Sequence, residues 1–207
     1  MGILRSGVAA LFVLFGATVT AFPAVGDGGP PGAHEQAYYP SLWRGLYGGL
    51  HAGFGWAGDA DGAIGGAQLG YNWQSQQLVY GIEGDITLSD IGVRETVFGP
   101  FGFATASGSI DWMTTVRGRL GVLVQPRLLF YATAGLGIVS AEAKASIAGF
   151  GSFSQHETDT VFVYGLGVES KWTETTSVRV EYLGFGETSV VDSFGVIRLG
   201  VNFKFGP

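Results

Sequence analysis

Apolar residues alternate with polar or small residues along most of the chain from Gly45 onward. A period of two is typical of β-strands, in which successive side chains point to opposite faces. Near the C-terminus, for example, Leu199 and Val201 share one face and Arg198 lies on the other. Eight such segments are predicted as strands, and they span about 45–56, 64–74, 78–88, 110–124, 128–139, 161–172, 177–186 and 195–205.

The chain is strongly apolar, yet it contains no candidate for a membrane helix beyond its N-terminal segment. Hydrophobic residues make up 46% of the sequence, and the mean hydropathy is +0.30. No later run of apolar residues reaches the roughly 18 that a membrane-spanning helix needs. A closed barrel of strands satisfies every backbone group within a bilayer. The sequence therefore predicts an all-β fold, an eight-stranded antiparallel up-and-down transmembrane β-barrel over 45–205.

A soluble lipocalin-like barrel would have the same alternation but would keep its apolar faces inside. Two features favour the membrane barrel. The polar faces are rich in glycine and carry charges of both signs, which suits an enclosed interior better than an open surface. The tryptophans of the predicted apolar faces lie near strand ends, as in the aromatic girdles of outer-membrane barrels, and they are Trp56, Trp73, Trp112 and Trp172.

The predicted connections alternate in length. Short turns are expected at 75–77, 125–127 and 173–176, and longer loops at 57–63, 89–109, 140–160 and 187–194. Short turns on one side and long loops on the other are typical of outer-membrane barrels, whose short turns face the periplasm. An even number of strands places both termini on that side.

The N-terminus has the layout of a secretory signal peptide. Arg5 provides a positive charge, an apolar core follows over 8–19, and small residues at Val19 and Ala21 suit a cleavage site. We therefore predict a signal peptide over 1–21 and export to the outer membrane of a Gram-negative bacterium. The following segment, 22–44, is rich in glycine and proline and is predicted to be a flexible tether outside the fold.

Charged residues gather on the predicted inner face. Counted from the short turns, Glu83 matches Arg119 and Asp85 matches Arg117 on the neighbouring strand, which suggests cross-strand ion pairs. Barrel shear leaves the partners open. The predicted lumen cluster comprises Glu83, Asp85, Arg117, Arg119, Glu169, Lys171, Arg179, Glu181, Arg198 and His51. The cluster could act as a gate or selectivity filter, but a structural network that fills the narrow barrel is favoured.

The sequence excludes several classes of function. With 11 basic and 17 acidic residues, the net charge is −6 and no basic block exists, so nucleic-acid binding is not expected. Cysteine is absent, which rules out disulfides and zinc–thiolate sites. No P-loop, zinc motif or dinucleotide fingerprint is present. We predict that the protein is not an enzyme and has neither catalytic residues nor a metal site.

The long loops suggest two ligands. Nine carboxylates there face only Arg94 and Lys144, so divalent cations could bridge them to lipid phosphates. A merely solvated acidic rim is the favoured alternative. Because a histidine can ligate haem iron, Phe150, Phe153 and His156 form a possible ligand loop, although no cofactor is required.

Several motifs resemble the small outer-membrane β-barrel proteins of alphaproteobacteria. These motifs occur in the family's order between about 45 and 205, and they are Tyr47–Gly53, Gly66–Gln74, Tyr80–Asp85, Thr115–Gly121, Gly165–Glu169 and Val180–Leu183. Members are described as porin-like surface antigens, and some bind haemin. The resemblance implies an eight-stranded outer-membrane barrel with no shared catalytic residues. Here Gly206 and Pro207 follow Phe205, whereas the family usually ends on this phenylalanine, which the barrel-assembly machinery reads.

The favoured role is structural, in envelope integrity and surface display. A narrow porin-like diffusion channel and a haem- or ligand-binding surface receptor are the alternatives. The expected partners are outer-membrane lipid, lipopolysaccharide and, during insertion, the barrel-assembly machinery. The sequence leaves the oligomeric state open.

Overall fold

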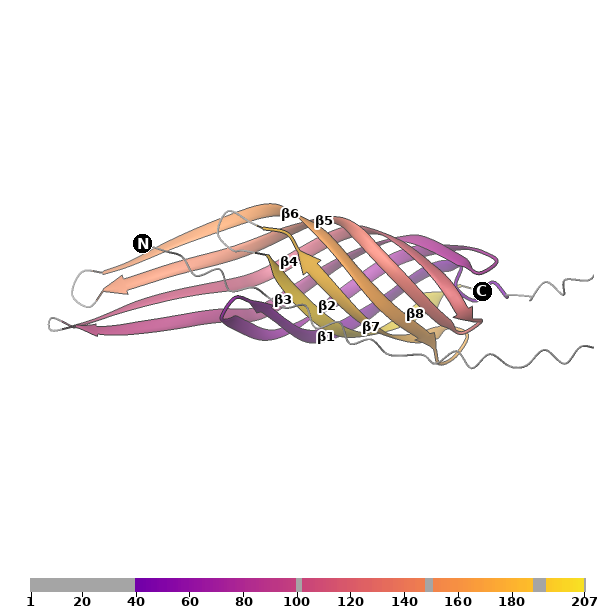
Figure 1. Cartoon of the computed structure of the whole chain (residues 1–207), viewed down its shortest axis with the longest axis horizontal. Coiled ribbons are helices and arrows are strands. Elements are labelled where there is room, and N and C mark those ends of the chain that lie inside the picture. The colour runs from indigo at the N-terminus through magenta and orange to yellow at the C-terminus, as the bar shows by residue number, and fades with distance from the viewer. Residues whose placement is uncertain (1–39, 100–101, 148–150, 188–192, 207) are drawn as a thin grey trace, which may run out of the picture. The chain divides into compact units, whose positions relative to one another are not determined.

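The chain forms a closed antiparallel barrel of eight strands (Figure 1). The computed structural model describes residues 40–99, 102–147, 151–187 and 193–206. Each strand pairs with the next, and β8 closes the barrel against β1. The strands are β1 (Gly45–Ala57), β2 (Ala60–Ser75), β3 (Leu78–Gly99), β4 (Gly102–Gln125), β5 (Leu128–Ile147), β6 (Gly151–Lys171), β7 (Thr176–Phe185) and β8 (Phe194–Phe205). The predicted eight-stranded barrel is confirmed.

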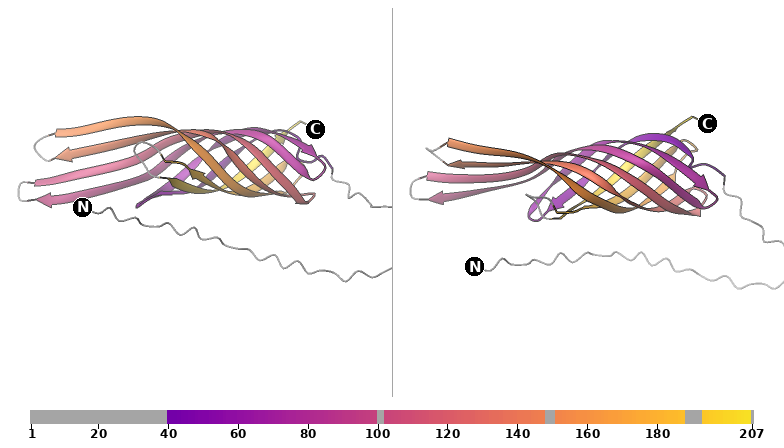
Figure 2. Two further views of the ribbon diagram at one scale, coloured as in Figure 1. Left: turned by 45° about the horizontal axis from the view of Figure 1, so that its top comes forward. Right: turned by 90° about the horizontal axis from the view of Figure 1, so that it is seen from above.

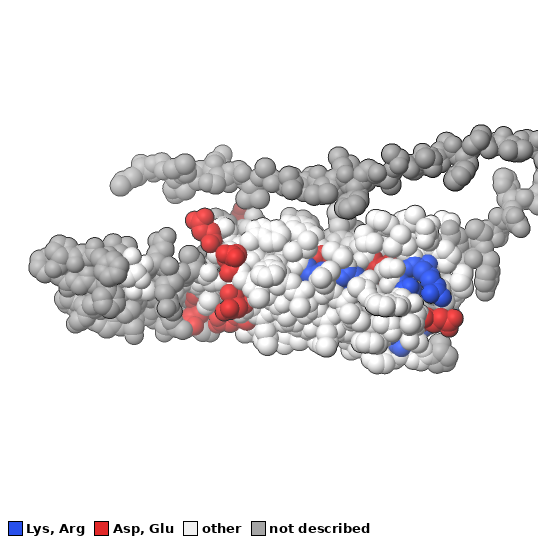
Figure 3. Space-filling view, turned by 90° about the horizontal axis from the view of Figure 1, so that it is seen from below, with Lys and Arg blue, Asp and Glu red and all other residues white. Residues whose placement is uncertain are grey.

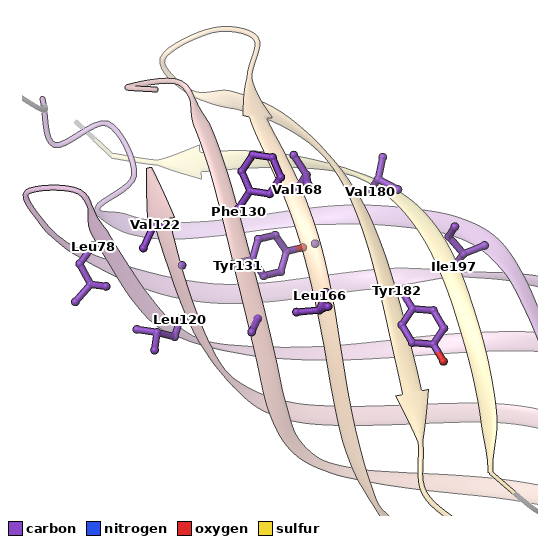
Figure 4. A pocket seen from close by; sticks show the side chains of 13 residues that line it. Leu78, Leu120, Val122, Phe130, Tyr131, Leu166, Val168, Val180, Tyr182 and Ile197 are labelled. Carbon is purple, nitrogen blue, oxygen red and sulfur yellow. The ribbon is translucent and has the colours of Figure 1, made fainter. Parts of the chain in front are cut away.

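The two faces of the barrel wall differ as the alternation predicts. Leu50 is 67% exposed on the outer face, whereas its neighbour His51 is 5% exposed inside. On the outer face of β4, β5 and β6, Leu120, Phe130 and Leu166 surround a shallow apolar hollow (Figure 4). In the part of the chain that the structure describes, no helix is long and apolar enough to cross a membrane.

Four of the strands extend further than the others at one end of the barrel. The predicted loops 89–109 and 140–160 are largely strand, because β3 continues to Gly99 and β5 to Ile147. The β3–β4 and β5–β6 hairpins extend past the other four strands (Figures 1 and 2). Alternating β-branched and small residues permit this continued pairing, as at Thr96 and Thr105, whose hydroxyls lie 3.3 Å apart. We call this end the hairpin end and the opposite end the turn end.

The prediction of a longer loop over 57–63 is wrong. Strands β1 and β2 pair as far as Ala57 and Ala60, which leaves only Gly58 and Asp59 between them. Gly58 has a φ of 61°, a left-handed conformation that glycine adopts without steric cost. The connection between β7 and β8 is longer, from residue 186 to 193.

A bulge overturns one predicted side-chain direction. By the alternation, Ile110 shares the predicted outer, apolar face of Trp112, but it is 3% exposed and lies inside the barrel. The register between β4 and β5 shifts between Ile110 and Trp112, and that between β3 and β4 shifts between Leu88 and Ile91. An extra residue in a strand inverts the alternation beyond it, so Ile110 joins Ile91 in the interior.

Three layers fill the interior. A hairpin-side apolar layer comprises Ile64, Ile91, Ile110, Met113, Val139, Val161, Val163, Leu183, Phe185, Phe194 and Val196. A turn-side apolar layer comprises Trp43, Val79, Leu123, Leu129 and Tyr131. Between them lie buried arginines and carboxylates, which we call the ionic layer and describe below. The predicted inner face is therefore apolar toward the hairpins, charged in its middle, and lined by both apolar and polar side chains at the turn end.

The last residues of the predicted tether pack against the barrel. Trp43 is 3% exposed, and its indole Nε1 donates a hydrogen bond to the Pro126 carbonyl at 3.1 Å. Its backbone N–H donates to the Gln74 side chain, also at 3.1 Å. A buried indole needs both apolar contacts and a hydrogen-bond acceptor, and Trp43 finds both at the turn end. A segment expected outside the fold thus closes this end of the barrel. The structure describes the tether from Pro40 onward.

Candidate functional site: the charged barrel interior

Eight charged side chains from five strands form the ionic layer. They are Glu83 and Asp85 of β3, Arg117 and Arg119 of β4, Glu169 of β6, Arg179 and Glu181 of β7, and Arg198 of β8. All eight are buried, and four arginines face four carboxylates. Such balance is required in a narrow interior, because an unpaired buried charge is very costly.

Glu83 lies at the centre of the layer. Its carboxylate accepts hydrogen bonds from Arg117 at 2.7 Å and from Arg179 at 2.5 Å. The Tyr47 hydroxyl of β1 donates a third, at 2.7 Å. Glu83 therefore connects β1, β3, β4 and β7 across the lumen rather than along one side of the wall.

Asp85 forms the second centre. The predicted pair with Arg117 is present, with 2.7 Å between Arg117 Nη2 and Asp85 Oδ2. The Thr115 hydroxyl donates to the same carboxylate at 2.7 Å, and Arg198 of β8 lies 3.3 Å away. Arg117 thus bridges both acidic residues of β3, as the forked guanidinium geometry allows.

Arg119 does not pair with Glu83, contrary to the match counted from the turns. It lies opposite Gly81 in the β3–β4 register, while Glu83 lies opposite Arg117. Tilted barrel strands are staggered, so equal distances from a turn do not bring two residues together. Arg119 instead pairs with Glu169 of β6, and its guanidinium carbon lies 3.7 Å above the Tyr131 ring.

The second predicted charge set merges with the first. Glu169 lies opposite Arg179 in register, but it pairs with Arg119 and accepts hydrogen bonds from Ser177 and Asn202. Glu181 pairs with Arg198 at 2.6 Å and lies 3.4 Å from Arg117. One network therefore spans β3, β4, β6, β7 and β8.

His51 lies at the edge of the ionic layer. Its Nδ1 is 2.6 Å from Gln68 Oε1, and its Nε2 is 2.9 Å from the Thr87 hydroxyl. Gln68 donates its amide group to Asn202 at 2.8 Å, so its Oε1 is the acceptor and His51 Nδ1 is the donor. The imidazole thereby joins β1, β2 and β3 by neutral groups beside the charged ones.

Lys171 lies apart from the other predicted cluster residues. It ends β6 at the mouth of the turn end, where its ammonium group is 5.1 Å from the centre of the Trp43 ring.

Sequence reasoning also missed Ser177 as a partner of Glu169. Its inward position follows from the alternation with Arg179, but the contact depends on how β7 sits beside β6.

Glycines make room for the large interior side chains. A Cβ at Gly167 would collide with the Tyr131 ring and hydroxyl, and one at Gly49 would collide with Asn202 and Gln68. The absence of a side chain at these two positions lets the tyrosine and the amide pair fill the lumen. At other glycines, such as Gly53 and Gly135, an added Cβ would first meet a backbone carbonyl of the neighbouring strand, so there glycine permits close approach of the strands.

The proposed ligand loop is only partly visible. Phe150 lies outside the described residues. Phe153 and His156 belong to β6, where they pair in register with Ala145 and Glu142, but their side chains lie outside the described part. The haem hypothesis therefore stays a prediction. Among the described residues, no group of histidines and carboxylates could hold a metal ion.

Solved barrels resemble this one in architecture. The N-terminal β-barrel domain of Pseudomonas aeruginosa OprF is 15% identical, with a TM-score of 0.49 over 78% of this chain and 98% of that one. Ail, the attachment invasion locus protein of Yersinia pestis, is 16% identical, with a TM-score of 0.47 over 78% of this chain and 99% of that one.

Sequence relatives come from alphaproteobacteria. The 31 kDa outer-membrane immunogenic protein of Brucella melitensis biotype 1 is 29% identical, over 70% of this chain and 68% of the relative. The 22 kDa outer membrane protein of Rhizobium leguminosarum bv. viciae is 30% identical, over 66% and 63%. The 25 kDa outer-membrane immunogenic protein of Brucella ovis is 28% identical, over 96% of each chain.

The family match extends over almost the entire sequence. Residues 9–205 match the family described as outer membrane protein beta-barrel domain. This match and the alphaproteobacterial relatives confirm the resemblance seen in the sequence motifs. The chain therefore belongs to this family of small, non-enzymatic β-barrel proteins of the Gram-negative outer membrane.

Proposed function

We propose that the barrel is a non-conducting structural element of the outer membrane that displays its long hairpins to the outside. The observation that carries this proposal is the layered interior. A paired ionic layer lies between two apolar layers, and these layers contain Val79, Leu129 and Phe185, each of which is at most 1% exposed. An eight-stranded barrel is just narrow enough for side chains to fill it.

The alternative, a narrow diffusion channel, needs a continuous polar path between the two mouths. At the hairpin end, the Phe185 and Phe194 rings stack with 4.4 Å between their centres and 5° between their planes. At the turn end, Trp43 is held by two hydrogen bonds over the turn-side layer. At the turn end, however, Glu169 of the ionic layer also lines a small polar hollow with Lys171 and Asn202. The packed apolar layer at the hairpin end therefore interrupts a polar path, and this favours the structural role over the channel.

Planar-bilayer conductance of the refolded barrel tests this proposal. We expect no discrete current steps, while a known outer-membrane channel added to the same bilayer gives steps and shows that the assay works. The matched variant Arg119→Ala/Glu169→Ala removes one ion pair without changing the net charge, and it should also be silent because both apolar layers remain. Reproducible steps from the wild-type barrel would contradict the proposal.

Surface display rests on the hairpins and on the named relatives. The β3–β4 and β5–β6 hairpins project beyond the other strands (Figure 2), and short turns of outer-membrane barrels face the periplasm. The hairpins are then the outermost part of the molecule. The Brucella relatives are named immunogenic proteins, and we infer the same accessibility for these hairpins.

The absence of cysteine makes this orientation measurable. Thr96→Cys places a thiol at an exposed site of the β3–β4 hairpin, and Glu174→Cys places one at an exposed site of the turn end. A membrane-impermeant maleimide added to intact cells should label the first variant and label the second only after lysis. The reverse pattern would refute the display role and leave the conductance result unaffected.

A further inference from the structure

Charges outside the ionic layer are separated between the two ends of the barrel. At the turn end, the cations are Arg44, Arg127, Lys171 and Lys204, and Glu174 is the nearby carboxylate. At the hairpin end, the exposed described charges are carboxylates, among them Asp59, Asp61, Asp90 and Glu187. Figure 3 shows acidic side chains gathered toward the hairpins and basic ones toward the opposite end.

The four cations surround the mouth of the turn end. The Lys171 backbone N–H donates a hydrogen bond to the Arg127 carbonyl at 2.9 Å, which joins the end of β6 to the turn between β4 and β5. Lys204 lies opposite Tyr47 in β1, close to the Arg44 position. Lys171 and Lys204 line one small hollow beside Trp43. Within the described ranges, none of the four cations forms a salt bridge.

Aromatic side chains mark the level of the membrane interface at the same height. Trp172 is 77% exposed and follows Lys171 directly, and the exposed Phe205 follows Lys204. Trp73 and Tyr80 stack on the outer face nearby, with 5.8 Å between their ring centres. Because such girdles lie at the lipid headgroups, the half-buried Lys204 lies at the level of the phosphates, whereas the buried Lys171 faces Trp43 inside the mouth.

We propose that the turn end is a docking surface for anionic phospholipids, whose phosphate groups pair with the exposed Arg44 and Arg127 and the half-buried Lys204. Charge complementarity selects this occupant, since juxtamembrane basic clusters attract anionic lipids. The hairpin end, with exposed carboxylates next to the Trp56–Tyr182 pair, has the opposite preference. The inference depends on the position of the girdle and is independent of whether the barrel conducts.

Tryptophan quenching by brominated lipids can report on each end separately. Trp56→Phe/Trp112→Phe retains the turn-end tryptophans, Trp43, Trp73 and Trp172. Trp43→Phe/Trp73→Phe/Trp172→Phe retains those nearer the hairpin end and serves as the matched control. Both proteins are refolded in phosphatidylcholine vesicles with about one-fifth phosphatidylglycerol. Two sets of vesicles are compared: in one the phosphatidylglycerol is brominated, and in the other the phosphatidylcholine is brominated.

In the turn-end reporter, quenching per brominated lipid should be about two- to fivefold stronger for phosphatidylglycerol than for phosphatidylcholine. It should show no such preference at the hairpin end. At about 1 M salt, where the Debye length is only about 3 Å, the turn-end preference should disappear. Adding Arg44→Gln, Arg127→Gln and Lys204→Gln to the turn-end reporter should abolish it at low salt.

Equal quenching by both lipids at the turn end would overturn the proposal, and so would the same enrichment at both ends. A preference that survives high salt would show that charge does not select the lipid, which also overturns it. The salt series uses the reporter with Arg44, Arg127 and Lys204 intact, so it decides the matter even if the triple variant fails to fold.

Discussion

The ionic layer and the hairpin-side apolar layer occupy the same barrel and consist of the same alternating strands, yet they are held together differently. In the ionic layer, each carboxylate has particular partners on other strands, as Glu83 has in Arg117 and Arg179. In the hairpin-side layer, the Phe185 and Phe194 rings contact each other by apolar packing, without hydrogen bonds or charges between them. The ionic layer thus specifies which strands face each other, while the apolar layer excludes water and ions.

This difference has an energetic side. A buried ion pair gains little over a well-packed apolar pair, because desolvation offsets most of its attraction. Removal of one partner, in contrast, leaves an uncompensated charge. The ionic layer should therefore be more sensitive to single truncations than its net contribution to stability suggests. The following predictions test this contrast, in order of decreasing effect.

Glu83→Ala should be the most damaging. It leaves Arg117 and Arg179 short of a carboxylate in a buried site, and we expect the free energy of unfolding to fall by about 3–5 kcal/mol. Urea unfolding in lipid vesicles measures this change. The control Glu174→Ala removes an exposed carboxylate from a turn and should stay within about 0.5 kcal/mol. A loss below about 1 kcal/mol for Glu83→Ala would mean that the layer is hydrated.

Phe185→Ala tests the apolar layer. Loss of this buried ring leaves a cavity beside Phe194, with an expected cost of about 3 kcal/mol in the same unfolding assay. Phe185→Leu retains most of the volume and should cost about 1 kcal/mol. If both variants cost the same, the layer is not packed as tightly as its burial indicates.

Gly167→Ala tests the space that the interior leaves for Tyr131. The added methyl forces this ring away from Arg119, and we expect a loss of about 2 kcal/mol. Gly118→Ala is the matched control, since a Cβ there meets only the Ala134 carbonyl at 3.8 Å. It should change the unfolding free energy by less than about 0.5 kcal/mol. Equal effects would show that the clash at Gly167 is relieved at no cost.

Trp43→Phe should have the smallest effect. It keeps an aromatic ring over the turn-side layer but removes the hydrogen bond to the Pro126 carbonyl. The expected loss is about 1 kcal/mol, the usual value of such a bond. Trp43→Ala, which also removes the ring, should cost clearly more in the same assay. Two neutral variants would indicate that residues 40–44 do not contribute to closure of the turn end.

The sequence by itself determined the number of strands, their approximate bounds and the face on which most side chains lie. It could do so because an alternation of period two fixes side-chain direction locally, wherever no bulge intervenes. His51, Glu83 and Arg198 could therefore be placed inside from the pattern alone. The same pattern failed at Ile110, where a bulge that no composition signal announces inverts the faces.

The tertiary structure alone decided which charges meet. Arg119 and Glu169 are 50 residues apart and lie on strands that do not pair with each other, so no local pattern could join them. Their contact depends on the stagger of the closed sheet, which is a property of all eight strands together. The packing of Trp43 beneath the turn end has the same origin, because its acceptor at Pro126 lies 83 residues away.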